Sequence, residues 1–236
     1  MPVVAVLAAL DEEIEAFRGA HTLAPAEEGT PFAAFRFRVG AVDAVLMRTG
    51  VGKAFAAMVA QRAIDRVRPD YLIVTGIAGS VRGGLDLGDV VVSRDCVQHD
   101  LDATALGFEL GQVPYTEHRI LRADPRLVDL ALATPVDGQR VVAGRILTGD
   151  QFVSDPDAAL RERLSELEGS VVEMEGAAIA LVATVNRVPF VIIRSVSDKA
   201  DAAAPADFGA FLRRAASNSY TVCAGILEYL APRRPE

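Results

Sequence analysis

Three apolar segments of this chain each lead directly into acidic residues. They are Val3–Ala9 before Asp11–Glu13, Val171–Val172 before Glu173 and Glu175, and Phe190–Val196 before Asp198. In open α/β sheets, ligands bind beyond the carboxyl ends of the strands. Carboxylates brought to that edge from distant parts of a sequence can give and take protons, so the pattern indicates an acid–base site.

The residues around Glu13 have the period of a helix. Leu10, Ile14 and Phe17 share one face at roughly 100° per residue. Glu13 lies about 60° from Leu10 and about 40° from Phe17 on this helix, so we expect its side chain to face the protein. The structural alternative is an acid that stabilises the first helical turn through the helix dipole. That alternative fits the acids on the outer face better than it fits Glu13.

The other acids also have a structural and a functional interpretation. Glu173 and Glu175 interrupt an otherwise apolar stretch, and an ionised carboxylate is costly to bury unless it is paired or hydrogen-bonded. A helix N-terminus could satisfy one of them, whereas the hydroxyl groups of a ligand could satisfy both. Asp198 ends the last predicted strand, where either a turn or N-cap aspartate or a proton donor would fit.

The remaining motifs are weaker. Phe152 and Val153 fit core packing or, for Phe152, a platform for a planar base. The run Thr49–Lys53 resembles part of a phosphate loop but lacks the Walker spacing. Gly76 and Gly79 do not form a dinucleotide fingerprint, and we interpret them as glycines that let backbone amides approach a small ligand. The three histidines have no metal-ligand spacing, so no metal site is predicted.

Composition limits the class of protein. The chain has 236 residues and a net charge of −8, which fits one domain over residues 1–236 and argues against nucleic acid or an anionic membrane surface as partners. The two cysteines are far apart without a CxxC motif, which favours a reducing cytoplasm. The apolar run at the start is too short to span a bilayer, and we expect it to be a buried strand.

Predicted strands alternate with predicted helices along the chain. This order predicts an α/β fold, a three-layer sandwich in which helices flank a central mixed, mainly parallel β-sheet. His99–Tyr115 is predicted to be a long loop. The predicted strands are Val3–Ala9, Phe32–Val39, Val42–Met47, Tyr71–Val74, Val90–Ser93, Arg140–Leu147, Val171–Glu173 and Val188–Val196. Besides the helix that carries Glu13, the predicted helices are Gly52–Val67, Asp157–Leu167, Met174–Val185 and Phe208–Leu230.

Taken together, the motifs resemble those of the 5′-methylthioadenosine/S-adenosylhomocysteine nucleosidases, in the purine nucleoside phosphorylase-like superfamily. The match runs almost from end to end, and the segments Val172–Glu175 and Arg194–Asp198 are its most specific parts. The matching segments are Leu10–Ile14, Thr49–Lys53, Thr75–Gly79, His99–Asp102, Thr148–Phe152, Val172–Glu175 and Arg194–Asp198.

The resemblance implies hydrolysis of the N-glycosidic bond to adenine, without a metal or organic cofactor. Glu13 matches the residue that activates water, and Glu175, with Glu173 beside it, matches the group that holds the ribose hydroxyls. Asp198 matches the acid that protonates N7 of adenine, and Phe152 matches the stacking residue. The other residues that match the substrate pocket are Val51, Ile77, Ala78, Gly79, Val153 through its backbone, Met174, Ser197 and Phe208.

The chain departs from the family pattern at three positions. Ile77 stands where these nucleosidases often carry serine, and Leu106 stands where an aromatic residue commonly arrives from the neighbouring subunit. Lys199 follows Asp198 where a smaller apolar residue is common, and we expect it to point outward. The family usually forms homodimers, which implies that Leu106 and Pro114 close the neighbouring pocket.

Three alternative functions remain open. They are a futalosine-type nucleoside hydrolase, a purine nucleoside phosphorylase and a nucleoside-binding homologue without turnover. Glu13 favours water over phosphate, because a carboxylate beside the anomeric carbon repels an anion. Asp198, as a proton donor, favours a 6-aminopurine over hypoxanthine. The presence of all three acids argues against a protein that only binds.

Overall fold

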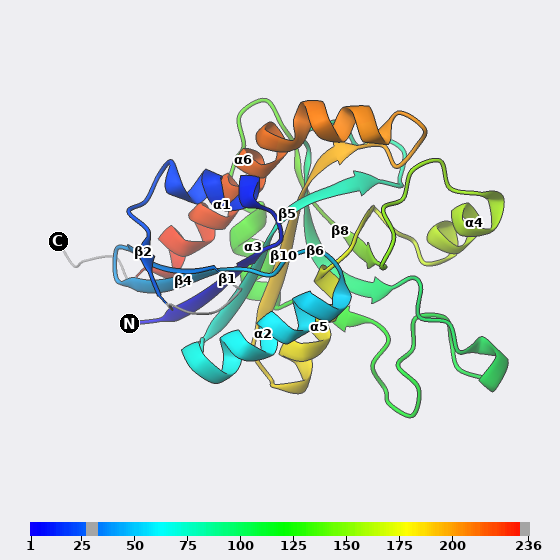
Figure 1. Ribbon diagram of the computed structural model, residues 1–236, viewed down its shortest axis with the longest axis horizontal. Helices are drawn as coiled ribbons and strands as arrows, with labels where there is room; N and C mark the ends of the chain where they lie inside the picture. Colours follow the sequence, from blue (N-terminus) through cyan, green and yellow to red (C-terminus); the bar gives the residue numbers. More distant parts are fainter. Residues whose placement is uncertain (27–32, 232–236) are drawn as a thin grey trace.

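The computed structural model describes residues 1–26 and 33–231, and its strands and helices alternate as expected (Figure 1). The strands are β1 (Val3–Ala8), β2 (Ala24–Pro25), β3 (Ala34–Val39), β4 (Val42–Arg48), β5 (Tyr71–Ser80), β6 (Val90–Gln98), β7 (Leu121–Arg122), β8 (Val141–Thr148), β9 (Val171–Glu173) and β10 (Phe190–Asp198). The helices are α1 (Asp11–Arg18), α2 (Lys53–Val67), α3 (Pro125–Leu132), α4 (Ala158–Glu166), α5 (Gly176–Val185) and α6 (Ala204–Leu230), with a short 3₁₀ helix η1 (Thr104–Leu106).

The predicted mixed sheet is confirmed, and part of it closes on itself. β1 lies parallel between β4 and β5, and β3 and β2 continue the sheet beyond β4. β5 also pairs with β10, after which β6, β8 and β9 follow in order, and β9 returns to β5. Five strands therefore form a closed ring, which removes the exposed edge at that end of the sheet.

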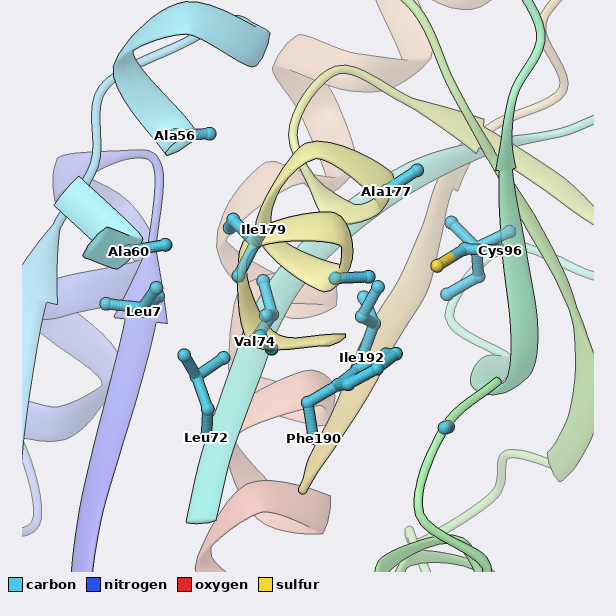
Figure 2. Close-up of a cluster of buried hydrophobic side chains, with 14 of the residues drawn as sticks. Leu7, Ala56, Ala60, Leu72, Val74, Cys96, Ala177, Ile179, Phe190 and Ile192 are labelled. Atoms are coloured by element: carbon cyan, nitrogen blue, oxygen red, sulfur yellow. The ribbon is translucent and has the colours of Figure 1, made fainter. Parts of the chain in front are cut away.

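Helices cover both faces of the sheet and bury an apolar core on each. On one face α2 and α5 pack against each other, and Ala60 of α2 lies beside Leu7 of β1 (Figure 2). Ala56, Ala60 and Ile179 belong to the same apolar cluster as Leu72 and Val74 of β5. On the other face α1, α3 and α6 cover the strands. Each fully buried Leu, Val or Ile contributes about 1.5–3 kcal/mol through the area removed from water.

Several strands extend further than their apolar patterns predict. β5 continues from Val74 to Ser80, β6 continues from Ser93 to Gln98, and β10 ends at Asp198 instead of Val196. β5 and β10 pair in parallel, and an irregularity after Val196 sets Asp198 opposite Gly79. The apolar pattern ends at Val74, but pairing with β10 as far as Gly79 and with β9 at Gly79 and Ser80 keeps the small residues after Val74 extended.

The ends of other elements also differ from prediction. α5 begins at Gly176 with Glu175 as its N-cap residue, and α6 begins at Ala204 instead of Phe208. α3 was not predicted, although Asp124 caps it by accepting a hydrogen bond from the Leu127 amide. Phe32, the predicted start of a strand, lies outside the described residues.

The predicted loop over 99–115 is largely irregular, and the part around η1 projects from the body of the molecule (Figure 1). None of the helices among the described residues is both long enough and apolar enough to cross a membrane.

Candidate active site

One cavity opens where β1, β5, β9 and β10 end. The three predicted acid–base residues, Glu13, Glu175 and Asp198, all line it. The cavity is lined by Ala9, Leu10, Glu13, Val51, Ile77, Ala78, Gly79, Phe152, Val172, Glu173, Met174, Glu175, Ser197, Asp198 and Phe208.

Three of the predicted site residues do not line this cavity. Val153 is buried beside it and packs in an apolar cluster with Leu164 and Leu167. Its side chain therefore has a core role, and only its backbone could reach a ligand. Leu106 is 71% exposed on the projecting segment around η1, and Pro114 follows in the same segment. Their expected contact with a neighbouring subunit stays a prediction.

Glu13 is held at the start of α1 with its carboxylate turned inward. The side chain is only 3% exposed, as its helical position predicts. Oε2 accepts hydrogen bonds from the amides of Ala9 (2.7 Å) and Leu10 (3.0 Å), and Oε1 accepts one from Ile77 (3.2 Å). Burial raises the pKa of Glu13, while the nearby Arg194 and these amides act in the opposite direction. A buried carboxylate with a raised pKa is suited to take a proton from water near neutral pH.

Glu13, Glu173 and Glu175 surround the buried guanidinium of Arg194, and we call these four residues the arginine cluster. Arg194 is 1% exposed and donates to Glu173 through Nε (3.1 Å) and through Nη2. Its Nη2 lies 3.6 Å from a carboxylate oxygen of Glu175. Arg194 is not among the site residues predicted from the sequence. An arginine within an apolar strand was the available signal, because a buried charge requires partners.

The two glutamates of the segment Val172–Glu175 differ in their hydrogen bonding. Glu173 accepts hydrogen bonds from Arg194, from the Thr148 hydroxyl and from the amides of Glu175 (3.2 Å) and Gly176 (2.8 Å). It therefore fixes the start of α5 and the arginine. Glu175 accepts the Gly52 amide at 2.9 Å. Burial raises the pKa of Glu175, and the charge of Glu173 adds to this effect. Glu175 is the better placed of the two to accept hydrogen bonds from a ligand.

Asp198, Phe152 and Phe208 form the other end of the cavity, which we call the aspartate end. Asp198 is 2% exposed, and its carboxylate accepts the Ala200 amide (2.9 Å) and the Ser197 hydroxyl (2.8 Å). Burial raises the pKa of Asp198 despite these two hydrogen bonds. A carboxyl group that keeps its proton to higher pH is suited to act as a general acid.

The aromatic side chains of the aspartate end remain accessible to a ligand. The rings of Phe152 and Phe208 meet edge to face, with centroids 5.6 Å apart. Phe152 is 44% exposed, so an aromatic face is available for stacking on a planar group.

The two glycines of β5 are required for a structural reason that the sequence alone did not reveal. A Cβ at Gly76 would lie 2.6 Å from Oε1 of Glu13, and one at Gly79 would lie 2.6 Å from Oδ1 of Asp198. These glycines leave room for the two acids, and Gly79 also lines the cavity.

Two of the departures from the family pattern can be located. Ile77 lines the cavity and packs against Phe208 and Leu212. Lys199 turns away from the cavity, as expected, because its ammonium donates to the Leu85 carbonyl and lies 3.8 Å from Asp86. Among the described residues, no group of three or more His, Cys, Asp or Glu side chains is arranged to hold a metal ion.

Comparisons with known proteins place this chain in a family. A family model described as "Phosphorylase superfamily" matches residues 3–228. The 5′-methylthioadenosine/S-adenosylhomocysteine nucleosidase of Geobacillus sp. (strain WCH70) is 40% identical over 234 residues, which cover 96% of this chain and 98% of that protein.

Solved structures give the same result. The crystal structure of the corresponding nucleosidase from Neisseria meningitidis in complex with methylthio-immucillin-A has a TM-score of 0.91 at 36% identity and covers 98% of this chain and 100% of that one. A futalosine hydrolase of Helicobacter pylori has a TM-score of 0.89 at 27% identity, covering 97% and 98% of the two chains. The chain therefore belongs to the phosphorylase superfamily and, within it, to the 5′-methylthioadenosine/S-adenosylhomocysteine nucleosidase family.

Proposed function

We propose that this protein hydrolyses the N-glycosidic bond of 5′-methylthioadenosine and S-adenosylhomocysteine, releasing adenine and the 5′-thioribose product. The observation that carries the proposal is the single cavity that Glu13, Glu175 and Asp198 line together with an accessible Phe152. The full-length similarity to nucleosidases of this specificity supports the choice of substrate.

In the proposed reaction, adenine stacks on Phe152 and the ribose hydroxyls donate to Glu175. Glu13 takes a proton from a water molecule that attacks the anomeric carbon. The bond to adenine breaks, and Asp198 gives its proton to N7 so that the base leaves uncharged. The surrounding carboxylates stabilise the positive charge that develops on the sugar. The two acid–base steps each contribute roughly 10²–10⁴-fold to the rate.

The other lining residues have supporting roles in this proposal. Ser197 orients Asp198 through its hydroxyl, which lies 2.8 Å from Oδ2. Met174 and Phe208 form apolar walls for the sugar and its 5′ substituent, together with Val51 and Ile77. Ala78, Gly79 and the backbone of Val153 contact the base. We assign Glu173 to holding Arg194 and α5, because its oxygens already accept several protein donors.

Water is favoured over phosphate as the nucleophile. The sugar binds beside the arginine cluster in this proposal, where three carboxylates line the cavity. The guanidinium of Arg194 lies among these carboxylates and already donates to Glu173. An incoming phosphate dianion would meet Glu13, and none of the described residues that line the cavity is a lysine or an arginine that could offset the repulsion. The reaction requires neither a metal nor an organic cofactor in this proposal.

Steady-state assays of the purified protein test the function. Adenine release from methylthioadenosine and S-adenosylhomocysteine is measured with and without phosphate, beside hypoxanthine release from inosine and futalosine. We expect adenine release that is independent of phosphate. Faster hypoxanthine release would favour the futalosine-type hydrolase, to which the Helicobacter pylori structure is similar. A requirement for phosphate would indicate a phosphorylase, and intact substrates would contradict an enzymatic role.

The assembly and location follow from the same proposal. We propose a homodimer of single-domain subunits spanning residues 1–236, in which Leu106 and Pro114 complete the neighbouring cavity. The apolar side chains of Val51, just before α2, of Met58 within α2 and of Leu106 in η1 are exposed and support a buried interface that includes them. Light scattering should give twice the subunit mass, and a monomer would contradict the dimer.

We further propose that the protein acts in the cytoplasm on small-molecule nucleosides, without nucleic acid or membrane partners. Two buried free cysteines, Cys96 and Cys223, and the net charge of −8 support this. Fractionation of cells that produce the protein should recover it with cytoplasmic markers.

A further inference from the structure

Three segments far apart in the sequence meet beside the cavity through one ring of hydrogen bonds. Nζ of Lys53 donates to Oδ1 of Asp100 at 2.6 Å, and the Asp150 amide donates to Oδ2 of Asp100 at 2.9 Å. Oδ1 of Asp150 in turn accepts the backbone amide of Lys53 at 2.8 Å. The ring therefore ties the first turn of α2 to the chain just after β6 and just after β8.

The ring replaces the usual cap of α2. Its N-cap residue is Gly52, which has a φ of +95° and no side chain to satisfy the first helical amides. Asp150 supplies that acceptor from another segment, and its negative charge lies at the positive end of the helix dipole. A Cβ at Gly52 would lie 3.2 Å from the Asp150 carboxylate, so the glycine permits this approach.

Residues next to the ring contact groups that bind the substrate in the proposed reaction, or are such groups themselves. The Gly52 amide donates to Oε1 of Glu175 at 2.9 Å, so the position of the glycine turn determines one hydrogen bond of that carboxylate. On the other side, Phe152 follows Asp150 by two residues and lines the cavity. The ring thus joins the supports of a sugar-binding acid and of an aromatic platform.

The surroundings of Asp100 make this ring stronger than an ordinary surface ion pair. The side chains of Lys53 and Asp100 are 19% and 29% exposed. Partial burial alone would raise the pKa of Asp100, but the hydrogen bonds from Lys53 and the Asp150 amide lower it below its usual value. The preceding residue, His99, is buried under Gly149 and leaves little space for this segment to shift.

We propose that Asp100 and Lys53 are positioning residues of this nucleosidase. Through Gly52 and Asp150, they fix the positions of Glu175 and Phe152 relative to each other. This inference rests on the proposed function for the roles of Glu175 and Phe152. It assigns a task to two charged residues that do not line the cavity themselves.

The test compares Asp100→Asn, Lys53→Met and the double variant with the wild-type protein. The ring requires both partners, so each single change should lower kcat/KM for methylthioadenosine by about ten- to 100-fold, as misplacement of a binding group does. The kcat/KM of the double variant should be no lower than that of the less active single variant, because both changes break the same ring. Lys53→Arg should restore part of the activity.

Asp102→Asn is the matched control. Asp102 lies two residues after Asp100 and forms an ion pair with Arg163 at 3.2 Å, but both side chains are more than one third exposed and neither lines the cavity. This variant should keep kcat/KM within about twofold of the wild type, because exposed pairs contribute little.

Two further measurements separate positioning from a general loss of stability. Loss of the Gly52 hydrogen bond raises the pKa of Glu175, so the dependence of KM on pH should move to higher pH in Asp100→Asn. Deuterium exchange should become several-fold faster in the peptides that cover residues 50–55 and 149–154, with distant core peptides unchanged.

The possible failures are distinguishable. If the wild type cleaves nucleosides and both single variants retain its kcat/KM and exchange, the positioning role is wrong. If the wild type cleaves no nucleoside, the proposed function is wrong. Deuterium exchange then still tests the hydrogen-bond ring, and exchange that is unchanged in the variants would show that the ring does not hold these segments. If Asp100→Asn does not fold, Lys53→Met decides by the same measurements.

Discussion

The two ends of the cavity differ in the charges that they bury and in the groups that hold those charges. The arginine cluster gathers three buried carboxylates around one fully buried cation, and its groups are held by backbone amides and by the start of α5. The aspartate end has one buried acid, which two neighbouring donors hold, and a half-exposed aromatic ring beside it. A reaction that develops positive charge on a sugar needs fixed negative groups at one end and a proton at the other.

The comparison indicates which groups can change without loss of the fold. Removal of the Arg194 charge leaves the buried carboxylates of the arginine cluster without their cation, whereas Asp198 or Phe152 can be replaced by a group of similar shape at lower cost. Stability and activity should therefore separate at the aspartate end and fall together when Arg194 is replaced.

The largest effect is expected for Asp198→Asn. The amide keeps the shape and can still accept the Ala200 amide, but it has no proton to give to the leaving base. We expect kcat for methylthioadenosine to fall by roughly 10²–10⁴-fold, with the melting temperature and adenine binding close to wild type. Stopped-time adenine assays and calorimetry measure these quantities. Full activity in this variant would contradict the role of Asp198.

The next effect is on stability and concerns Arg194→Met. Loss of the cation leaves Glu173 without its charged partner, and we expect the free energy of unfolding to fall by about 3–5 kcal/mol. The matched control is Arg48→Met, which breaks a surface pair with Asp11 at 2.6 Å and should cost about 0–1 kcal/mol. Urea unfolding of both variants measures the difference. Equal costs would show that the arginine cluster is not the stabilising network described.

A smaller effect is expected for Phe152→Ala. Stacking of a base on an aromatic ring contributes about 1–3 kcal/mol, so KM should rise accordingly while kcat changes less. Phe152→Tyr keeps the ring and serves as the control. An unchanged KM in Phe152→Ala would place the base elsewhere in the cavity.

The smallest effect concerns the pH dependence of stability. The pKa of Glu13 is raised in the folded protein above its usual value of 4.5. At pH values between the pKa of the unfolded state and that of the folded state, the folded state therefore binds more protons. The contribution of Glu13 to stability therefore falls as pH rises through that window, by at most about 1.4 kcal/mol per pH unit. Glu13→Gln removes this contribution, so its stability relative to wild type should improve as pH rises above about 4.5. A pH-independent difference would mean that the pKa is not raised.

Local patterns predicted the parts of the fold that depend on nearby residues. The apolar runs indicated most of the strands, and the period of α1 predicted that Glu13 faces inward, which its 3% exposure confirms. α3 was missed although Asp124 and Pro125 carry a helix-start signal. Closure of the five-stranded ring could not be predicted, because it depends on the pairing of the very short β9 with two distant strands.

The candidate site shows the same division. The acids could be located because each one follows an apolar strand, and motif resemblance added Phe152 and Met174. Arg194 was overlooked because its importance lies in contacts with Glu173 at the end of β9 and with Glu175, the N-cap residue of α5. The different duties of those two glutamates could be distinguished only from their hydrogen bonds.

The most direct test of the central claim is a crystal structure of the Glu13→Gln variant with methylthioadenosine bound. We predict adenine stacked on Phe152 with N7 facing Asp198, and both ribose hydroxyls toward Glu175. A nucleoside bound outside this cavity, or one with its sugar at the aspartate end, would contradict the account.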